Sequence, residues 1–123
     1  MGKTVAIFGT HCILELYECP PTRLDDPEAV VAALRSAATS AGATMLSHVV
    51  HRFTPHGVTA LGLLAESHIS IHTWPERGYV ACDVFTCGDR TDPERACEEL
   101  ARALGAARHW LRYVARGDEP VRV

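Results

Sequence analysis

The segment from Leu63 to Gly88, LLAESHISIHTWPERGYVACDVFTCG, carries side chains that a strand built only for packing would not need. It places Glu66, Ser67 and His72, and later Cys87, within runs of residues that are otherwise typical of apolar strands. A hydroxyl, an imidazole and a thiol are groups that proteins use for nucleophilic attack and proton transfer. We therefore expect the reactive chemistry of this chain to lie in this segment.

Ser67 follows Glu66 where two strand signals meet without Gly, Pro or Asn to form a turn. A chain that reverses there is strained, and strain at a peptide bond beside a hydroxyl favours self-cleavage of the backbone. The Ser67 oxygen would attack the Glu66 carbonyl, and the resulting ester would break by β-elimination when a base removes the Ser67 α-hydrogen. His72 is the candidate base. Hydrolysis of the dehydroalanine would leave a pyruvoyl group on residues 67–123 and release residues 1–66 as a second chain.

The spacing along the strand complicates the role of His72. Ser67 and His72 are five positions apart, so they face opposite sides of a regular strand. We expect release of the new terminus, together with a bulge before His72, to resolve this difference. His68 and His72 share a face, but no carboxylate or third histidine has an evident position beside them, and no metal is expected.

Several segments of the sequence resemble one family. The string ESHISIHTWPE, with HRFTPHGV upstream and FTCG downstream, closely resembles the prokaryotic S-adenosylmethionine decarboxylases, which are small pyruvoyl-dependent enzymes of spermidine synthesis. The string GTHCILELYEC near the start supports this resemblance, which extends from about Gly9 to Val114.

The resemblance implies roles for individual residues. Ser67 matches the pyruvoyl precursor, with cleavage after Glu66, and His72 matches the proton acceptor in processing. Cys87 matches the catalytic proton donor. Thr59 stands where the family pattern has a processing serine, and it departs from that pattern while keeping a hydroxyl.

The resemblance also implies the substrate and the reaction. Phe53 and Glu76 fall where the family places an aromatic ring against the adenosyl group and a carboxylate on its ribose hydroxyls. The amine of S-adenosylmethionine would form a Schiff base with the Ser67-derived ketone, and carbon dioxide would leave. The thiol of Cys87 would then donate a proton to the carbanion. The product would be decarboxylated S-adenosylmethionine, an aminopropyl donor for spermidine.

Two alternative functions remain open from the sequence. A pyruvoyl-dependent decarboxylase of arginine or ornithine would use the same machinery without the adenosyl contacts. A non-catalytic paralogue acting as a regulatory partner would keep the fold, but such a chain usually loses its nucleophile. Ser67, His72 and Cys87 are all present here.

The overall composition argues against several other classes of protein. The 123 residues are 47% hydrophobic and 22% charged with a net charge of -3, which is typical of a single globular domain spanning residues 1–123. The arginines are scattered among acids, so no nucleic-acid partner is expected. We also expect no membrane span and no signal peptide. The five cysteines are then expected to be reduced thiols in the cytoplasm.

The periodicity of apolar residues predicts the order β-α-β-β-β-β-α-β. The predicted strands cover residues 5–19, 44–53, 58–65, 67–73, 79–85 and 107–115, and the predicted helices cover 25–42 and 92–104. Mainly antiparallel strands with two helices on one face predict an α+β fold, a two-layer α/β sandwich. The uncovered sheet face favours association, and the resemblance implies a homodimer of cleaved αβ protomers with sites built from both.

Overall fold

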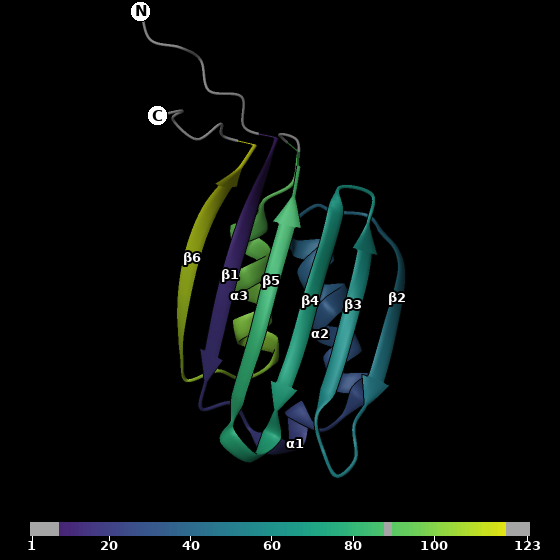
Figure 1. The fold of residues 1–123 in the computed structure, drawn as a ribbon, viewed down its shortest axis with the longest axis vertical. Helices are drawn as coiled ribbons and strands as arrows, with labels where there is room; N and C mark the ends of the chain where they lie inside the picture. The colour runs from purple at the N-terminus through teal and green to yellow at the C-terminus, as the bar shows by residue number, and fades with distance from the viewer. Residues whose placement is uncertain (1–7, 88–89, 118–123) are drawn as a thin grey trace, which may run out of the picture.

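The computed structural model describes residues 8–87 and 90–117, and within them six strands form one antiparallel sheet (Figure 1). The strand order is β2-β3-β4-β5-β1-β6. The strands are β1 (Gly9–Tyr17), β2 (Met45–Arg52), β3 (Val58–Leu64), β4 (Ser67–Trp74), β5 (Tyr79–Thr86) and β6 (Arg108–Arg116). The first strand in the chain therefore lies between the last two.

Helices α2 (Pro27–Ser40) and α3 (Pro93–Ala103) lie side by side behind the sheet (Figure 1). Each begins at an Asp-Pro pair, as the sequence predicts. The carboxylates of Asp26 and Asp92 cap the two helices by accepting hydrogen bonds from backbone N–H groups of the first turn. Two short elements, α1 (Pro21–Leu24) and the 3-10 helix η1 (Pro75–Arg77), were not predicted.

Strict alternation along the strands separates two faces of the sheet. Residues such as Leu14, Ile71 and Val84 are fully buried beneath α2 and α3 and form the core. Their neighbours in sequence point to the opposite face, which none of the described helices covers (Figure 1). We call this second face the open face. It carries His68, Ser70, His72 and Trp74 of β4 and the residues paired with them on neighbouring strands, because directly paired residues share a face.

The predicted α+β sandwich is confirmed, with local differences. The first strand ends at Tyr17 rather than at residue 19, because Glu18 takes a φ of 55° that breaks the strand conformation. The predicted bulge before His72 is wrong, since β4 pairs without a register shift with both β3 and β5 from Ser67 to His72. Residues 5–7 of the first predicted strand lie outside the described residues.

Candidate active site

The turn between β3 and β4 contains the Glu66–Ser67 peptide bond. Leu64 pairs directly with Ser67, so only Ala65 and Glu66 make the reversal. Ser67 has a φ of 150°, a conformation that residues with a side chain rarely adopt and that costs about 1 to 3 kcal/mol. The strain predicted from the sequence is therefore present in the residue that carries the hydroxyl.

Cys87 binds the carbonyl oxygen of Glu66 with two donors. Its backbone N–H donates at 3.1 Å and its thiol at 3.0 Å. On the other side of the turn, the backbone N–H of Thr44 donates to the Glu66 carboxylate at 3.2 Å, and Ala65 N–H donates to the Thr44 carbonyl at 2.9 Å. The Glu66 carbonyl is thus held in place, and its oxygen faces two donors of the kind that stabilise a developing negative charge.

Thr59 and His72 form a pair at the opposite end of the sheet. They are directly paired on β3 and β4, and Thr59 Oγ1 lies 3.1 Å from Nδ1 of His72. Beside them is a pocket of about 380 Å³ whose lining includes the predicted substrate-binding residues Phe53 and Glu76. The carboxylate of Glu76 also contacts the imidazole of His56. The pocket therefore joins the predicted processing pair to an aromatic ring and a carboxylate.

The predicted residues thus fall into two groups within one chain. Ser67 and His72 point to opposite faces of a regular β4, about 17 Å apart along the strand at its usual rise. The structure brings together Glu66, Ser67 and Cys87 at one end of the sheet, and Phe53, Thr59, His72 and Glu76 at the other. His72 does not reach the Ser67 α-hydrogen of its own chain in this geometry.

Asp83 of β5 organises a cluster on the open face between these two groups. One carboxylate oxygen, Oδ2, accepts hydrogen bonds from Nε2 of His11 at 2.7 Å and from Nε2 of His68 at 2.8 Å. The other oxygen accepts from the Ser70 hydroxyl. Burial raises the pKa of Asp83, but the bonds from Ser70, His68 and His11 outweigh burial and hold the pKa below its usual range. Asp83 is therefore an ionised carboxylate at neutral pH.

Sequence reasoning missed this cluster. We expected no carboxylate or third histidine beside His68, and the structure places both there, with the donor atoms of His11, His68 and Asp83 all within 4.8 Å of one another. His11 and Asp83 are 72 positions apart in the sequence. The alternating pattern puts each of them on a strand face, but only the pairing of β1 with β5 shows that the two faces meet.

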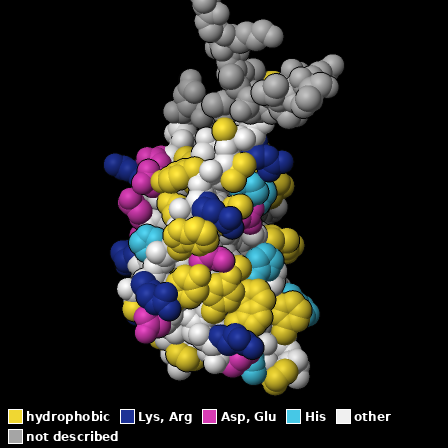
Figure 2. Space-filling model, turned by 60° about the vertical axis from the view of Figure 1, so that its left-hand side comes forward, with side chains coloured by type: hydrophobic (Ala, Val, Ile, Leu, Met, Phe, Trp, Pro, Cys, Tyr) yellow, Lys and Arg dark blue, Asp and Glu magenta, His cyan; other side chains and the backbone are white. Residues whose placement is uncertain are grey.

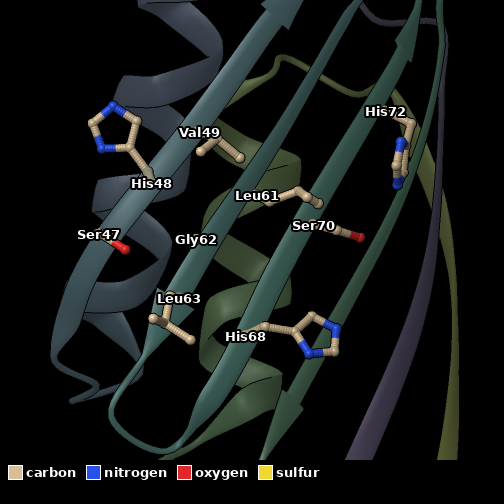
Figure 3. A pocket seen from close by; sticks show the side chains of 9 residues that line it. All are labelled: Ser47, His48, Val49, Leu61, Gly62, Leu63, His68, Ser70 and His72. Carbon is tan, nitrogen blue, oxygen red and sulfur yellow. The ribbon is translucent and has the colours of Figure 1, made fainter.

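A second pocket, of about 480 Å³, lies on the open face over β2, β3 and β4 (Figure 3). Apolar side chains of Val49, Leu61 and Leu63 line it from β2 and β3. In Figure 3 His68 and His72 project from β4 on the same side, as the sequence predicts. The pocket thus runs between the two groups of candidate residues.

The five cysteines, all in the described part of the chain, divide by exposure. Cys12, Cys19, Cys82 and Cys97 are buried, and only Cys87 is exposed. Burial raises the pKa of Cys19 to about 11, so its thiol stays protonated at neutral pH. Cys82 also lies on the helix side of β5, within the core. Cys87 is therefore the cysteine that a substrate can reach.

Among the described residues, none of the helices is long and apolar enough to cross a membrane.

Comparison with known proteins identifies the family of this chain. The family model for S-adenosylmethionine decarboxylase matches residues 10–117. The chain is 60% identical over 108 residues to the S-adenosylmethionine decarboxylase proenzyme of Parasynechococcus marenigrum, covering 88% of this chain and 84% of that protein. It is 41% identical over 113 residues to the proenzyme of Pseudomonas paraeruginosa, covering 92% and 71%.

A solved structure gives the same answer for the fold. The crystal structure of the adenosylmethionine decarboxylase from Aquifex aeolicus superimposes with a TM-score of 0.85 at 36% identity, covering 95% of this chain and 97% of that one. The fold and the relatives together define an enzyme, a small α+β decarboxylase. The chain belongs to the S-adenosylmethionine decarboxylase family.

Proposed function

We propose that this enzyme decarboxylates S-adenosylmethionine after cutting itself between Glu66 and Ser67 and converting Ser67 to a pyruvoyl group. The observation that carries the proposal is the pair of donors from Cys87 on the Glu66 carbonyl oxygen, next to the strained Ser67. The names of the two relatives, which call them proenzymes, are consistent with a chain that is processed before it acts.

The cleavage step follows from the turn. Attack of the Ser67 hydroxyl on the Glu66 carbonyl carbon places negative charge on the oxygen that Cys87 already contacts. The strain at Ser67 is relieved when the peptide bond becomes an ester and then breaks. The Glu66 side chain, bound to Thr44, keeps the departing chain end in place.

The geometry around Ser67 fits a pyruvoyl group. Ser67 is half-buried at the first position of β4, opposite Thr86 and beside the exposed thiol of Cys87. A ketone at this position supplies the electron sink that allows an amino-acid carboxylate to leave as carbon dioxide. Cys87 is placed to return the proton, because its thiol lies at the turn that contains Ser67.

The pocket of Phe53 and Glu76 is suited to the adenosyl part of the substrate. Phe53 is exposed and offers a ring face for stacking, and Glu76 offers a carboxylate for ribose hydroxyls. The same pocket includes Thr59 and His72. A substrate held in this pocket must also reach the Ser67-derived group. Within one chain that group lies at the opposite end of β4 from the pocket, too far away for the substrate to reach.

A homodimer removes this separation. Two open faces that pack together about a two-fold axis perpendicular to the strands bring the Ser67 end of one protomer over the His72 end of its partner. Apolar side chains exposed on the open face support this packing, including Val49, Leu63 and Trp110 at 64%, 53% and 54% exposure. Figure 2 shows hydrophobic side chains on the β6 side of the surface, interrupted by arginine and acidic groups.

We further propose that the enzyme acts in the cytoplasm and supplies aminopropyl groups for spermidine. The five free thiols support this location, because a reducing compartment keeps Cys87 available as a proton donor. The product of the proposed reaction, decarboxylated S-adenosylmethionine, carries the aminopropyl group.

Release of labelled carbon dioxide tests the substrate. Purified enzyme is given S-adenosylmethionine, arginine or ornithine, each labelled in the carboxyl carbon, and Glu76→Gln is assayed beside it. We expect release from S-adenosylmethionine alone, and a KM raised about tenfold in the variant because a charge-assisted hydrogen bond is lost. Release of carbon dioxide from arginine or ornithine, with the same KM for that amino acid in wild type and in Glu76→Gln, would overturn S-adenosylmethionine as the substrate. No release from any of the three would favour a non-catalytic paralogue.

A further inference from the structure

The Asp83 cluster links the strand that begins at Ser67 to the strand that ends next to Cys87. His68 directly follows Ser67 on β4, and its imidazole is bound to Asp83 at the centre of β5. The same carboxylate binds Ser70, two residues further along β4. Two consecutive open-face side chains at the start of β4 are therefore attached to one anion on β5.

The cluster is anchored from the other side as well. His11 of β1 binds Asp83, and Arg116 of β6 donates from Nη1 to Nδ1 of His11 at 3.1 Å. The rings of His11 and His68 pack on Phe85 of β5, with centroids 5.4 Å and 6.1 Å away. Asp83 is thus bound directly by side chains of β1 and β4, and these contacts are held in turn by Phe85 of β5 and Arg116 of β6.

The hydrogen-bond pattern favours protons over a metal ion in this cluster. A guanidinium only donates, so Nδ1 of His11 is an acceptor and the ring proton lies on Nε2, facing Asp83. A metal ion on Nε2 would require the proton on Nδ1, where it would oppose the Arg116 donor. The carboxylate is instead satisfied by three hydrogen-bond donors.

Cleavage after Glu66 changes what holds Ser67. In the uncut chain the two-residue turn ties Ser67 to Leu64 and β3. Once that bond is broken, Ser67 becomes a chain terminus, and termini open readily unless they are tied down. The first side chain that can tie down this terminus is His68, through Asp83.

We propose that Asp83 is a positioning residue which, through His68, holds the cut end of β4 so that the Ser67-derived group stays beside Cys87. The inference rests on the proposed function, because it concerns the chain after cleavage. In this role Asp83 makes no contact with the substrate. Its importance arises at the moment the covalent turn is lost, and the uncut chain does not need it in the same way.

The test compares Asp83→Asn with a matched control, Glu15→Gln. Glu15 lies on the same open face, and its carboxylate accepts a hydrogen bond from Tyr79 at 2.6 Å, away from the start of β4. Each change is made in the wild-type chain and in the uncleavable Ser67→Ala chain. The readouts are intact mass, hydrogen exchange of the β4 amides, and kcat and KM for carbon dioxide release.

We expect Asp83→Asn to be cut to completion, since the contacts of the Glu66 carbonyl remain. In the cut protein the amides of residues 68–71 exchange about tenfold faster than in wild type, beyond any change shared by core amides elsewhere in the sheet. In the Ser67→Ala background they change no more than those core amides do. The kcat falls about 100-fold with KM nearly constant, because the reacting group is misplaced while the substrate pocket is intact. Glu15→Gln behaves as wild type in each measurement.

Loosening of residues 68–71 relative to the rest of the sheet that is equal in the cut and uncut chains would overturn the proposal, since it would show a merely structural role for Asp83. Unchanged exchange and kcat in Asp83→Asn would overturn it as well. If Asp83→Asn does not fold, His68→Phe and His11→Phe each remove one Nε2 donor to Asp83, and only the His68 change should loosen residues 68–71. Failure of the proposed function is seen separately, because the wild-type chain would then show no cleavage by mass.

Discussion

The thiol of Cys87 lies 3.0 Å from the carbonyl oxygen of Glu66, and the backbone N–H of Cys87 donates to the same oxygen at 3.1 Å. One residue directly after β5 therefore binds the carbonyl that precedes the strained Ser67. The same thiol is available to the substrate after cleavage because Cys87 is exposed. The proposed mechanism therefore uses this one side chain in both processing and catalysis, and substitutions can separate the two steps.

Replacing Cys87 should affect the two steps differently. Cys87→Ala removes one of the two donors, so self-cleavage slows about tenfold to 100-fold while the backbone N–H remains. Cys87→Ser keeps a donor, so cleavage continues near the wild-type rate, but carbon dioxide release falls because a serine hydroxyl is a poor acid at neutral pH. Time courses of intact mass and of carbon dioxide release measure the two steps. Wild-type cleavage in Cys87→Ala would refute the role of the thiol in processing.

Thr59 is expected to orient His72 through the 3.1 Å contact between Oγ1 and Nδ1. Thr59→Val keeps the shape and removes the hydroxyl, so we expect self-cleavage to slow at least about tenfold. Thr59→Ser restores the oxygen and serves as the control, with cleavage close to wild type. A Thr59→Val chain that is cut as fast as the Thr59→Ser chain would show that His72 needs no partner here.

A mixed dimer tests whether each site uses two chains. A tagged His72→Ala chain is expressed with a Ser67→Ala chain, and neither is cut when expressed alone. If His72 acts on Ser67 of the partner subunit, the mixed dimer contains one complete site, and the tagged His72→Ala chain is cut. A partner with both substitutions is the control and should leave it uncut. Absence of cleavage in a confirmed mixed dimer would place the site within one chain and contradict the proposed assembly.

The ionisation of Asp83 should make the free energy of unfolding depend on pH. Its pKa in the folded protein is lower than in the unfolded chain, where it is about 3.9. Its hydrogen bonds therefore stabilise the fold above that pH, and this contribution is lost as the pH falls through the folded-state pKa. In the Ser67→Ala background at one protein concentration, Asp83→Asn should lower the free energy of unfolding by about 1 to 3 kcal/mol at pH 7. Denaturant titrations at pH 7 and pH 3 should show this difference shrinking in acid, and an equal difference at both would count against it.

The order of the elements and much of the site could be predicted because their signals are local. Alternating residues define β4, Asp-Pro pairs begin α2 and α3, and the lack of a turn-forming residue before Ser67 predicts the strain observed there. The resemblance located Cys87 and Thr59, which the structure places beside Glu66 and His72.

What the sequence could not provide depends on long-range pairing. The position of β1 between β5 and β6 brings His11 to Asp83, and no local pattern encodes that neighbour. A bulge before His72 would turn His72 toward the face of Ser67 within one chain, but β4 has none between Ser67 and His72. The regular pairing of β4 shows that the two ends stay apart, which is why we propose a second protomer.

The central claim, self-cleavage that creates a pyruvoyl group, is tested most directly by the intact mass of freshly purified protein beside a Ser67→Ala variant. We predict two fragments in wild type, residues 1–66 and residues 67–123, the second with a blocked terminus that reacts with a carbonyl reagent, and one uncut chain in the variant. A single uncut wild-type chain with no reactive ketone would contradict the claim.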